Sequence, residues 1–430
     1  MHEINGCRVI TFENNNFKTN SISFNIIQDL NLTTATKNAL LMKVLRRGCV
    51  EFESSKEIAT ELESCFGATL AVKIEKAGDN QIIGFVCSYP ADEFVGERLT
   101  LRLVDLLMAL IFNPLREVGG FRTDYLEQER ANLREQIEGL KDDKRSYALQ
   151  RCTELMFPDE PYGLSEIGDL EQLDQITNAE LFAHYQNLLQ TAQMVVFLSG
   201  RFDESIENEF VQILKTKLRR DVTAKELGRI KCKEGFSAAE SGGEKAFEFI
   251  EEMDVTQGKL TIGFTTETLP SSDEYVDLMV VNSIFGGGMH SKLFTEVREK
   301  QSLAYYAMTM MDKFKGVIFA AAGIDLQNKE KTQNLILEQL ENVQNGKISD
   351  FELTSAKKAL INSLRSLNDS QLSVQAFYFG QLLADSEFTI ELLIEKIANV
   401  KLPAVIDVSK RIQPHTIYFM TSSPEMGVSS

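Results

Sequence analysis

The 430-residue chain lacks several features that would assign it to a special class of protein. It has no apolar run of membrane-spanning length, since the most hydrophobic stretch, 103–112, covers about half a bilayer and contains Asp105. It has only 8 prolines, which argues against a linker-rich or fibrous protein. Its 6 cysteines form no CxxC pair, and their wide spacing indicates free thiols in a reducing compartment.

A basic excess is also missing. The chain has 63 acidic and 45 basic residues, so it lacks the basic footprint of a nucleic-acid-binding protein. An acidic surface can attract basic ligands, but carboxylates that only keep a protein soluble explain the charge more simply. Residues 1–11 lack the basic and apolar segments of a secretory signal. We therefore expect a cytoplasmic protein that binds neither nucleic acid nor membrane.

The predicted elements occur twice in the same order. The first half has strands, helices, strands and long helices in turn, at 7–12, 21–27, 35–47, 54–62, 69–74, 81–88, 91–112 and 121–143. The second half repeats them at 246–252, 259–265, 274–285, 291–299, 304–311, 316–323, 328–345 and 350–368. Late in each half single residues also match: Leu133, Ile137, Leu140 and Asp142 recur, at one constant spacing, as Leu360, Leu364, Leu367 and Asp369. The repeat indicates duplication of one α+β unit rather than a short-period solenoid.

We therefore predict an α+β fold of two homologous domains, each an antiparallel-rich sheet packed with helices. The length fits two domains of about 200 residues. The segment 219–245 is dense in charged residues and glycine and reads as a linker. The predicted boundaries are 1–218 for the N-terminal domain and 246–430 for the C-terminal domain.

Two segments resemble a known family. The first is 48–72, with Ser-Ser-Lys-Glu-Ile-Ala-Thr-Glu-Leu-Glu and then Phe-Gly-Ala-Thr-Leu-Ala-Val. The second is 285–306, with a Gly-rich turn followed by Ser-Lys-Leu-Phe, Val-Arg-Glu-Lys and Leu-Ala-Tyr-Tyr. Both are similar to the pitrilysin and insulinase family of zinc peptidases, the inverzincins, whose members also have duplicated domains. The second motif is specific, and the resemblance spans nearly the whole chain.

The resemblance implies where a zinc motif would lie. Active members carry HxxEH on a helix, where two histidines one turn apart hold zinc and the glutamate serves as general base. The family's spacing to Gly48 places this motif on 39–43, where Ala39, Met42 and Lys43 replace the His, Glu and His. A third ligand from the later helix would match one of four glutamates: Glu127, Glu129, Glu135 and Glu138. One carboxylate does not make a zinc site, so we expect no metal, no cofactor and no peptidase activity.

A different catalytic site is the main alternative to an inactive chain. The histidines are His2, His184, His290 and His415. They are widely spaced and none lies in a metal-binding frame, so structural or solvent-exposed roles are expected more often than ligation. The alternative is an active peptidase with an unrecognised metal or nucleophile site.

The second motif retains residues that reach the bound peptide in active members. The resemblance places that role on Arg298 and Tyr305, because a guanidinium can pair with a carbonyl or carboxylate and a phenol can donate a hydrogen bond. The competing interpretation is an internal ion pair for Arg298 and a core position for Tyr305. Gly286, Gly287 and Gly288 lack a nucleotide-binding frame. They are expected to end a helix, allow close backbone packing or belong to a flexible flap.

The family also implies a partner. Inactive members commonly pair with an active HxxEH chain, so this pseudoenzyme is expected to be the binding or scaffold subunit of a hetero-dimer that handles peptide or protein substrates. The second motif resembles most closely a bacterial branch of inactive subunits associated with modification of elongation factor P. A purely structural homodimer is the remaining alternative.

Overall fold

The computed structural model describes residues 2–202, 204–218, 220 and 246–423. The chain divides into two compact units, each built from segments of both halves of the sequence. Unit 1 consists of Met1–Gly139, Leu164–Arg229 and Asn368–Gly380, and unit 2 of Leu140–Gly163, Ile230–Leu367 and Gln381–Ser430. Except for Arg220, the predicted linker 219–245 lies outside the described residues.

Unit 1 is built on a six-stranded sheet with the order β1-β2-β8-β3-β5-β4. Its strands are β1 (His2–Ile4), β2 (Cys7–Glu13), β3 (Thr19–Asp29), β4 (Thr69–Ala77), β5 (Asn80–Pro90) and β8 (Gln193–Gly200). All neighbours are antiparallel except β2 and β8. The strands β2 and β3 follow each other in sequence, yet β8 lies between them in the sheet.

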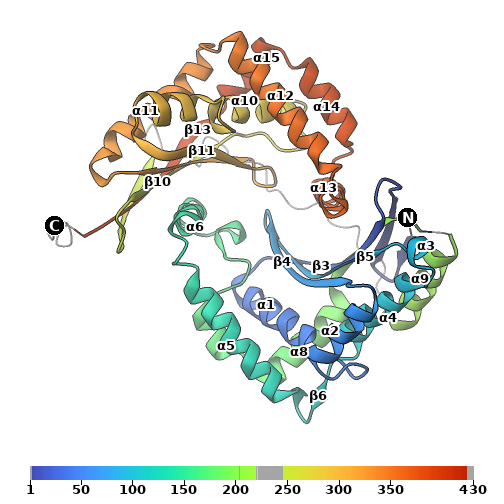
Figure 1. The fold of residues 1–430 in the computed structure, drawn as a ribbon. Coiled ribbons are helices and arrows are strands. Elements are labelled where there is room, and N and C mark those ends of the chain that lie inside the picture. Colours follow the sequence, from blue (N-terminus) through green and yellow to red (C-terminus); the bar gives the residue numbers. More distant parts are fainter. Residues whose placement is uncertain (1, 203, 219, 221–245, 424–430) are drawn as a thin grey trace. The chain divides into compact units, whose positions relative to one another are not determined.

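Helices cover one face of this sheet, with α1, α4 and α8 nearest the strands (Figure 1). The helices of the unit are α1 (Leu32–Arg47), α2 (Ser55–Ser64), α3 (Asp92–Val95), α4 (Leu99–Phe112), α5 (Thr123–Gly139), α7 (Leu170–Gln175), α8 (Asn178–Thr191) and α9 (Glu204–Lys217). A two-stranded ribbon, β6 (Arg116–Glu117) and β7 (Gly120–Phe121), connects α4 to α5. The single helix predicted over 91–112 is wrong, because Gly96 takes a left-handed conformation (φ 73°) and ends α3.

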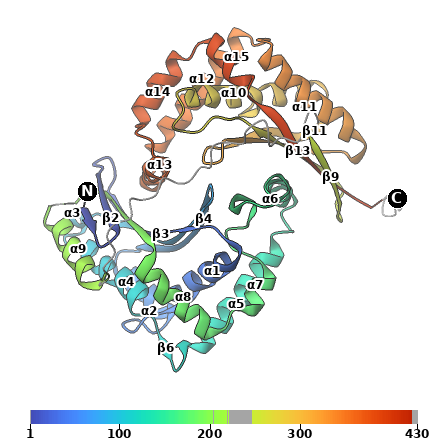
Figure 2. The same cartoon turned by 180° about the vertical axis from the view of Figure 1, so that it is seen from behind.

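Unit 2 is built on a five-stranded sheet with the order β11-β12-β10-β13-β9 (Figure 2). Its strands are β9 (Phe247–Glu252), β10 (Gly258–Thr265), β11 (Ala304–Asp312), β12 (Val317–Ile324) and β13 (Gln413–Thr421). Only β9 and β13 are parallel. The helices on one face of the sheet are α10 (Tyr275–Gly286), α11 (Lys329–Gln344), α12 (Asp350–Leu367), α14 (Ile390–Asn399) and α15 (Leu402–Ser409).

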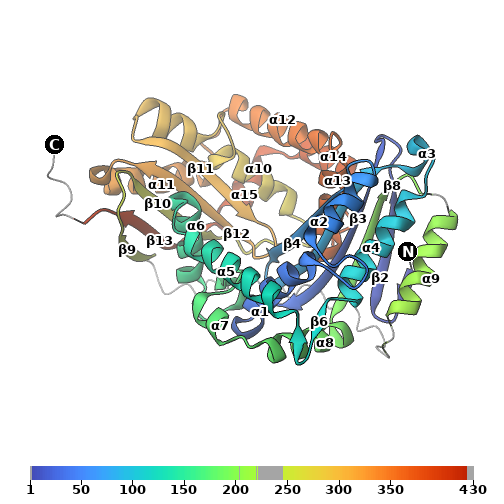
Figure 3. The ribbon, with the colours of Figure 1, turned by 60° about the horizontal axis from the view of Figure 1, so that its bottom comes forward.

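Two helices are exchanged between the halves of the chain. The helix α6 (Lys144–Met156) comes from the first half but packs on β10 and β13 of unit 2. The helix α13 (Gln371–Leu383) comes from the second half, and most of it belongs to unit 1. Figure 3 shows α6 beside β10 and α13 beside β3. The predicted boundaries 1–218 and 246–430 do not include this exchange.

The exchange follows from the duplication. The helices α5 and α12 carry the matching residues noted in the sequence, and α6 and α13 come next in each half. Unit 1 and unit 2 also share the pattern of a mostly antiparallel sheet with one parallel pair. The predicted α+β class with sheet-and-helix units is confirmed. In the described part of the chain, no helix combines the length and hydropathy that a membrane span requires.

Candidate functional site

The residues at the zinc-motif positions form part of the core of unit 1. Helix α1 begins after Asn31, whose side chain caps it by accepting a hydrogen bond from Thr34 N. Ala39 and Met42 are no more than 1% exposed, and Lys43 is half-buried. Met42 packs against residues of the sheet, including Phe24 and Phe85, whereas Arg47, one turn after Lys43, faces Glu129 of α5.

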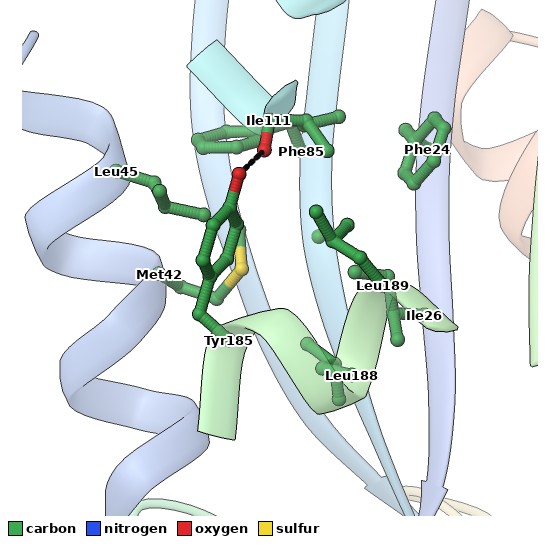
Figure 4. Close-up of a pocket in the computed structure, with 10 residues that line it drawn as sticks. Phe24, Ile26, Met42, Leu45, Phe85, Ile111, Tyr185, Leu188 and Leu189 are labelled. Carbon is green, nitrogen blue, oxygen red and sulfur yellow. Dashed lines mark hydrogen bonds between the residues drawn. The ribbon is translucent and has the colours of Figure 1, made fainter. Parts of the chain in front are cut away.

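Met42, at the position that the resemblance assigns to the general base, lines a small apolar cavity of about 10 Å³. Figure 4 shows its thioether packed close to Tyr185, whose hydroxyl donates to Ile111 O at 2.8 Å. The lining consists of Phe24, Ile26, Met42, Leu45, Gly84, Phe85, Ile111, Tyr185, Leu188 and Leu189. A cavity of this size takes at most about one water molecule, so the position contributes hydrophobic packing and no proton transfer.

One of the four candidate third ligands faces α1. Glu129 is 7% exposed and lies 3.5 Å from the Arg47 guanidinium of α1, measured from Oε1 to Nη1. Glu127 pairs instead with Arg130 on its own helix, and the other two carboxylates, Glu135 and Glu138, are exposed. The position of Glu129 could have been predicted, because it continues the buried stripe of Leu126 and Leu133 on α5.

These residues do not fit a zinc ion. Ala39 offers no donor atom, Met42 offers a thioether, and Lys43 carries a positive charge, whereas zinc needs imidazole, thiolate or carboxylate ligands. The one suitable carboxylate, Glu129, is already paired with a cation. Across the described residues, no group of three or more His, Cys, Asp and Glu side chains is arranged to hold a metal.

The four histidines do not form a cluster, and the side chain of each contacts a different residue. His2 pairs with Glu207, and His184 Nε2 lies 2.6 Å from Asn38 Oδ1. His290 Nε2 lies 3.1 Å from Ser283 Oγ, and His415 Nδ1 lies 2.7 Å from Thr416 Oγ1. Burial lowers the pKa of His184 to about 4 and also lowers the pKa values of His290 and His415. Sequence reasoning missed the contact of His184 with α1, which no local pattern signals.

Arg298 lies on an irregular helix of unit 2. Residues Leu293–Lys300 form a π-helix, a rare backbone form that is frequent at functional sites. Leu293 and Val297 are buried, whereas the Arg298 side chain is 44% exposed. Its guanidinium stacks 4.8 Å from the Phe294 ring and lies 3.8 Å from the carboxylate of the next residue, Glu299. The predicted internal ion pair is therefore a contact between exposed neighbours.

Tyr305 lies just beyond this helix, at a β-bulge in the edge strand β11. The register shifts between Ala304 and Tyr306, so Tyr305 is the extra residue, and bulges of this kind re-aim a side chain. Its side chain is 64% exposed, and its hydroxyl donates to Asp325 Oδ1 at 3.3 Å. Ser302, between the helix and the bulge, has a φ of 50°, which a non-glycine residue rarely adopts. Tyr305 is thus not a core residue.

The Gly-rich turn ends α10. Gly286 is the last residue of the helix, and a Cβ there would lie 2.6 Å from Thr309 N and from its methyl group. Only glycine therefore fits where α10 meets β11. Gly287 follows as the C-cap and donates to Ser283 O at 3.2 Å, and Gly288 comes next.

The structure places the predicted residues in two groups. Ala39, Met42 and Lys43 belong to unit 1, whereas Arg298 and Tyr305 belong with the Gly-rich turn to unit 2. In the first group Ala39 and Met42 are buried and Lys43 is half-buried, whereas Arg298 and Tyr305 are polar and exposed.

Comparisons with known proteins show the family to which the chain belongs. A family model described as the Peptidase M16 inactive domain matches residues 175–360. The protein named "Probable inactive metalloprotease YmfF" from Bacillus subtilis (strain 168) is 32% identical over 407 residues, which cover 94% of this chain and 93% of that protein.

Solved structures share the fold over nearly the whole chain. A conserved protein from Enterococcus faecalis V583 has a TM-score of 0.88 and 26% identity, covering 98% of this chain and 97% of that one. A Peptidase M16 inactive domain from Pseudomonas fluorescens has a TM-score of 0.77 at 17% identity, covering 97% of each chain. The chain therefore belongs to the M16 family of pitrilysin- and insulinase-like peptidases, as a catalytically inactive member.

Proposed function

We propose that this chain is the non-catalytic, substrate-binding subunit of a two-chain peptidase whose partner is a homologue with an intact HxxEH motif. The observation that supports the proposal is the exposure of Arg298 and Tyr305 in a motif whose apolar members, Leu293 and Val297, are buried. A motif kept for folding alone needs only those apolar residues.

The backbone around these two residues also supports a binding role. A π-helix, a left-handed Ser302 and a β-bulge follow one another between Leu293 and Tyr306. Sparsely populated conformations cost about 1–3 kcal/mol each and cluster at binding sites. Here they present one guanidinium and one phenol at the surface of unit 2.

The chemistry of the pair suits a peptide. The exposed Arg298 guanidinium has donors for a peptide carbonyl or carboxylate, because its pairing with Glu299 at 3.8 Å is too long for a hydrogen bond. The Tyr305 hydroxyl is held by a long hydrogen bond to Asp325 and can exchange it for a substrate group. We place the pair of chains in the bacterial cytoplasm and link it to modification of elongation factor P, following the resemblance of the second motif.

Co-expression tests the assembly. This chain and an HxxEH homologue encoded beside it should elute together in size-exclusion chromatography, and only the mixed sample should cleave peptides. The homologue alone should have little activity. Separate elution at micromolar concentration, with full activity of the homologue alone, would contradict the proposal. Self-association of this chain without the homologue would favour the structural homodimer.

Substitutions test the binding residues in the assembled pair. Tyr305→Phe removes one exposed hydroxyl, and we expect kcat/KM to fall about tenfold through loss of one substrate hydrogen bond. Arg298→Ala should lower it at least as much. Arg365→Ala, at an exposed arginine on α12, is the matched control and should leave cleavage unchanged. All three variants should keep the wild-type melting temperature. A drop in melting temperature with unchanged cleavage per folded molecule would show that the motif is structural.

A further inference from the structure

Arg47 and Glu129 form the contact that joins α1 to α5 in unit 1. The Arg47 Nη1 atom lies 3.5 Å from Glu129 Oε1, and the Glu129 side chain is only 10% exposed. The other carboxylate oxygen, Oε2, accepts a hydrogen bond from Asn132 at 3.1 Å. Both oxygens of the buried carboxylate therefore have partners within the chain.

Arg47 is also held from its other side. Its Nη2 donates to Gln128 Oε1, and its guanidinium lies 4.9 Å from the centre of the Tyr125 ring. All these partners come from α5, so the side chain is aligned by an amide, a ring and a carboxylate. An arginine with several oriented partners loses less entropy per contact than a flexible lysine.

The position of Arg47 on α1 links it to the lost metal. Ala39, Lys43 and Arg47 are spaced four residues apart, so they lie on one stripe of the helix. The first two occupy the positions of the zinc-binding histidines, and Arg47 lies one turn further along. The carboxylate that faces this stripe from α5 is Glu129.

We infer that the Arg47 guanidinium is a built-in cation that replaces zinc as the link between α1 and α5, with Glu129 as its anion. A buried carboxylate without a cation is strongly unfavourable, so a chain that loses zinc needs another positive partner for Glu129. Arginine provides one that stays charged and does not dissociate. The pair both stabilises unit 1 and withholds from zinc the last suitable ligand.

A double-mutant cycle tests the link. We expect Arg47→Met and Glu129→Gln each to lower the equilibrium constant for folding by about tenfold or more. The double variant should be only slightly less stable than either single variant. The folding equilibrium constants measured by urea unfolding should therefore show a coupling of about tenfold between positions 47 and 129. The control cycle uses Arg134 and Asp174, an exposed pair that also involves α5, and its coupling should be less than about threefold. Equal coupling in the two cycles would overturn the inference.

Zinc binding by redesigned chains tests the replacement. Ala39→His with Lys43→His restores the ligand pair, and this variant should bind zinc weakly while Arg47 holds Glu129. Adding Arg47→Met should tighten zinc binding about 10- to 100-fold in a competition titration, and adding Glu129→Gln should abolish the gain. Equal zinc affinity with and without Arg47 would overturn the inference. If Ala39→His prevents folding, the double-mutant cycle, which leaves Ala39 and Lys43 unchanged, tests the inference by itself.

Discussion

At the scale of single residues, His184 shows how a half-buried side chain contacts α1 in unit 1. Its Nε2 contacts Asn38 Oδ1, and the Asn38 amide donates to Gln81 Oε1 at 2.7 Å. Gln81 in turn donates to Ala35 O in the first part of α1. Burial lowers the pKa of His184 to about 4, with a smaller contribution from the nearby Lys37 charge. The folded chain therefore holds this imidazole neutral.

This predicts a loss of stability in mild acid. Between pH 6.5 and about pH 4 the unfolded chain binds a proton at His184 and the folded chain does not. The stability that His184 contributes is therefore complete above pH 6.5 and falls as the pH drops, by up to about 3 kcal/mol. Urea unfolding at pH 7, 6 and 5 should show a smaller decrease for His184→Gln than for the wild type. His2→Gln is the control, because the His2 side chain is 41% exposed, and its free energy of unfolding should fall with pH as in the wild type. Identical pH dependence of His184→Gln and wild type would refute the assignment.

At the scale of elements, α13 is attached to the sheet of unit 1 by buried polar groups. The Gln375 side chain accepts from Ser21 and donates to Ser23 of β3, and Gln371 donates to Ser199 of β8. These residues are all no more than 5% exposed. Polar groups buried in this way depend on one another, because each loses its water on folding.

Removing one member of this hydrogen-bonded group should therefore lower the free energy of unfolding more than removing all of its members. Gln375→Leu removes the acceptor of the Ser21 hydroxyl and one of the two amide donors to Ser23 Oγ, the other being Asn25 Nδ2. We expect a loss of about 1–3 kcal/mol in the free energy of unfolding. Adding Ser21→Ala and Ser23→Ala should recover most of it, because an apolar set has no unmet hydrogen bonds. Thermal and urea unfolding of the three-residue variant, Gln375→Leu alone and the wild type measure both effects. A triple variant less stable than Gln375→Leu would contradict this account.

At the scale of the whole molecule, the exchanged helices make each unit depend on both halves of the chain. The helix α6 contributes Ala148, Cys152 and Met156 to a hydrophobic cluster with residues of β12 and β13, including Phe319 and Tyr418. Burial raises the pKa of Cys152 to about 12, so its thiol stays protonated in the folded chain. Neither half has a complete set of core partners without the other.

Separated halves should therefore fold poorly. The pieces 1–218 and 246–430, expressed alone, leave the apolar side of α6 and the polar side of α13 without their sheets. We expect each piece to aggregate or to lack a cooperative melting transition, and co-expression to restore one folded species. Size-exclusion chromatography and circular dichroism melting of the separate and combined pieces give the answer. Two independently cooperative pieces would show that the exchange contributes little.

Much of the fold was predictable because its signals are local. The alternation and helical periodicity of apolar residues predicted strands such as β3 and helices such as α1, and the repeated order predicted duplication. The segment 91–112 was the clearest error, since the apolar content of α4 obscured the end of α3 at Gly96. The parallel pairing of β2 with β8 joins residues far apart in sequence, and periodicity carries no information about such pairs.

The sequence by itself predicted the loss of zinc ligation, because Ala39, Met42 and Lys43, at the positions that the resemblance assigns to the motif, lack suitable donor atoms. It also predicted a binding role for Arg298 and Tyr305, which stays a prediction, from a motif that is defined by residue identity. Only the tertiary structure decided that these two side chains are exposed, that Glu129 pairs with Arg47, and that α6 and α13 change places. The physical reason is that donor chemistry belongs to a single residue, whereas burial and pairing arise from contacts between residues far apart in the chain.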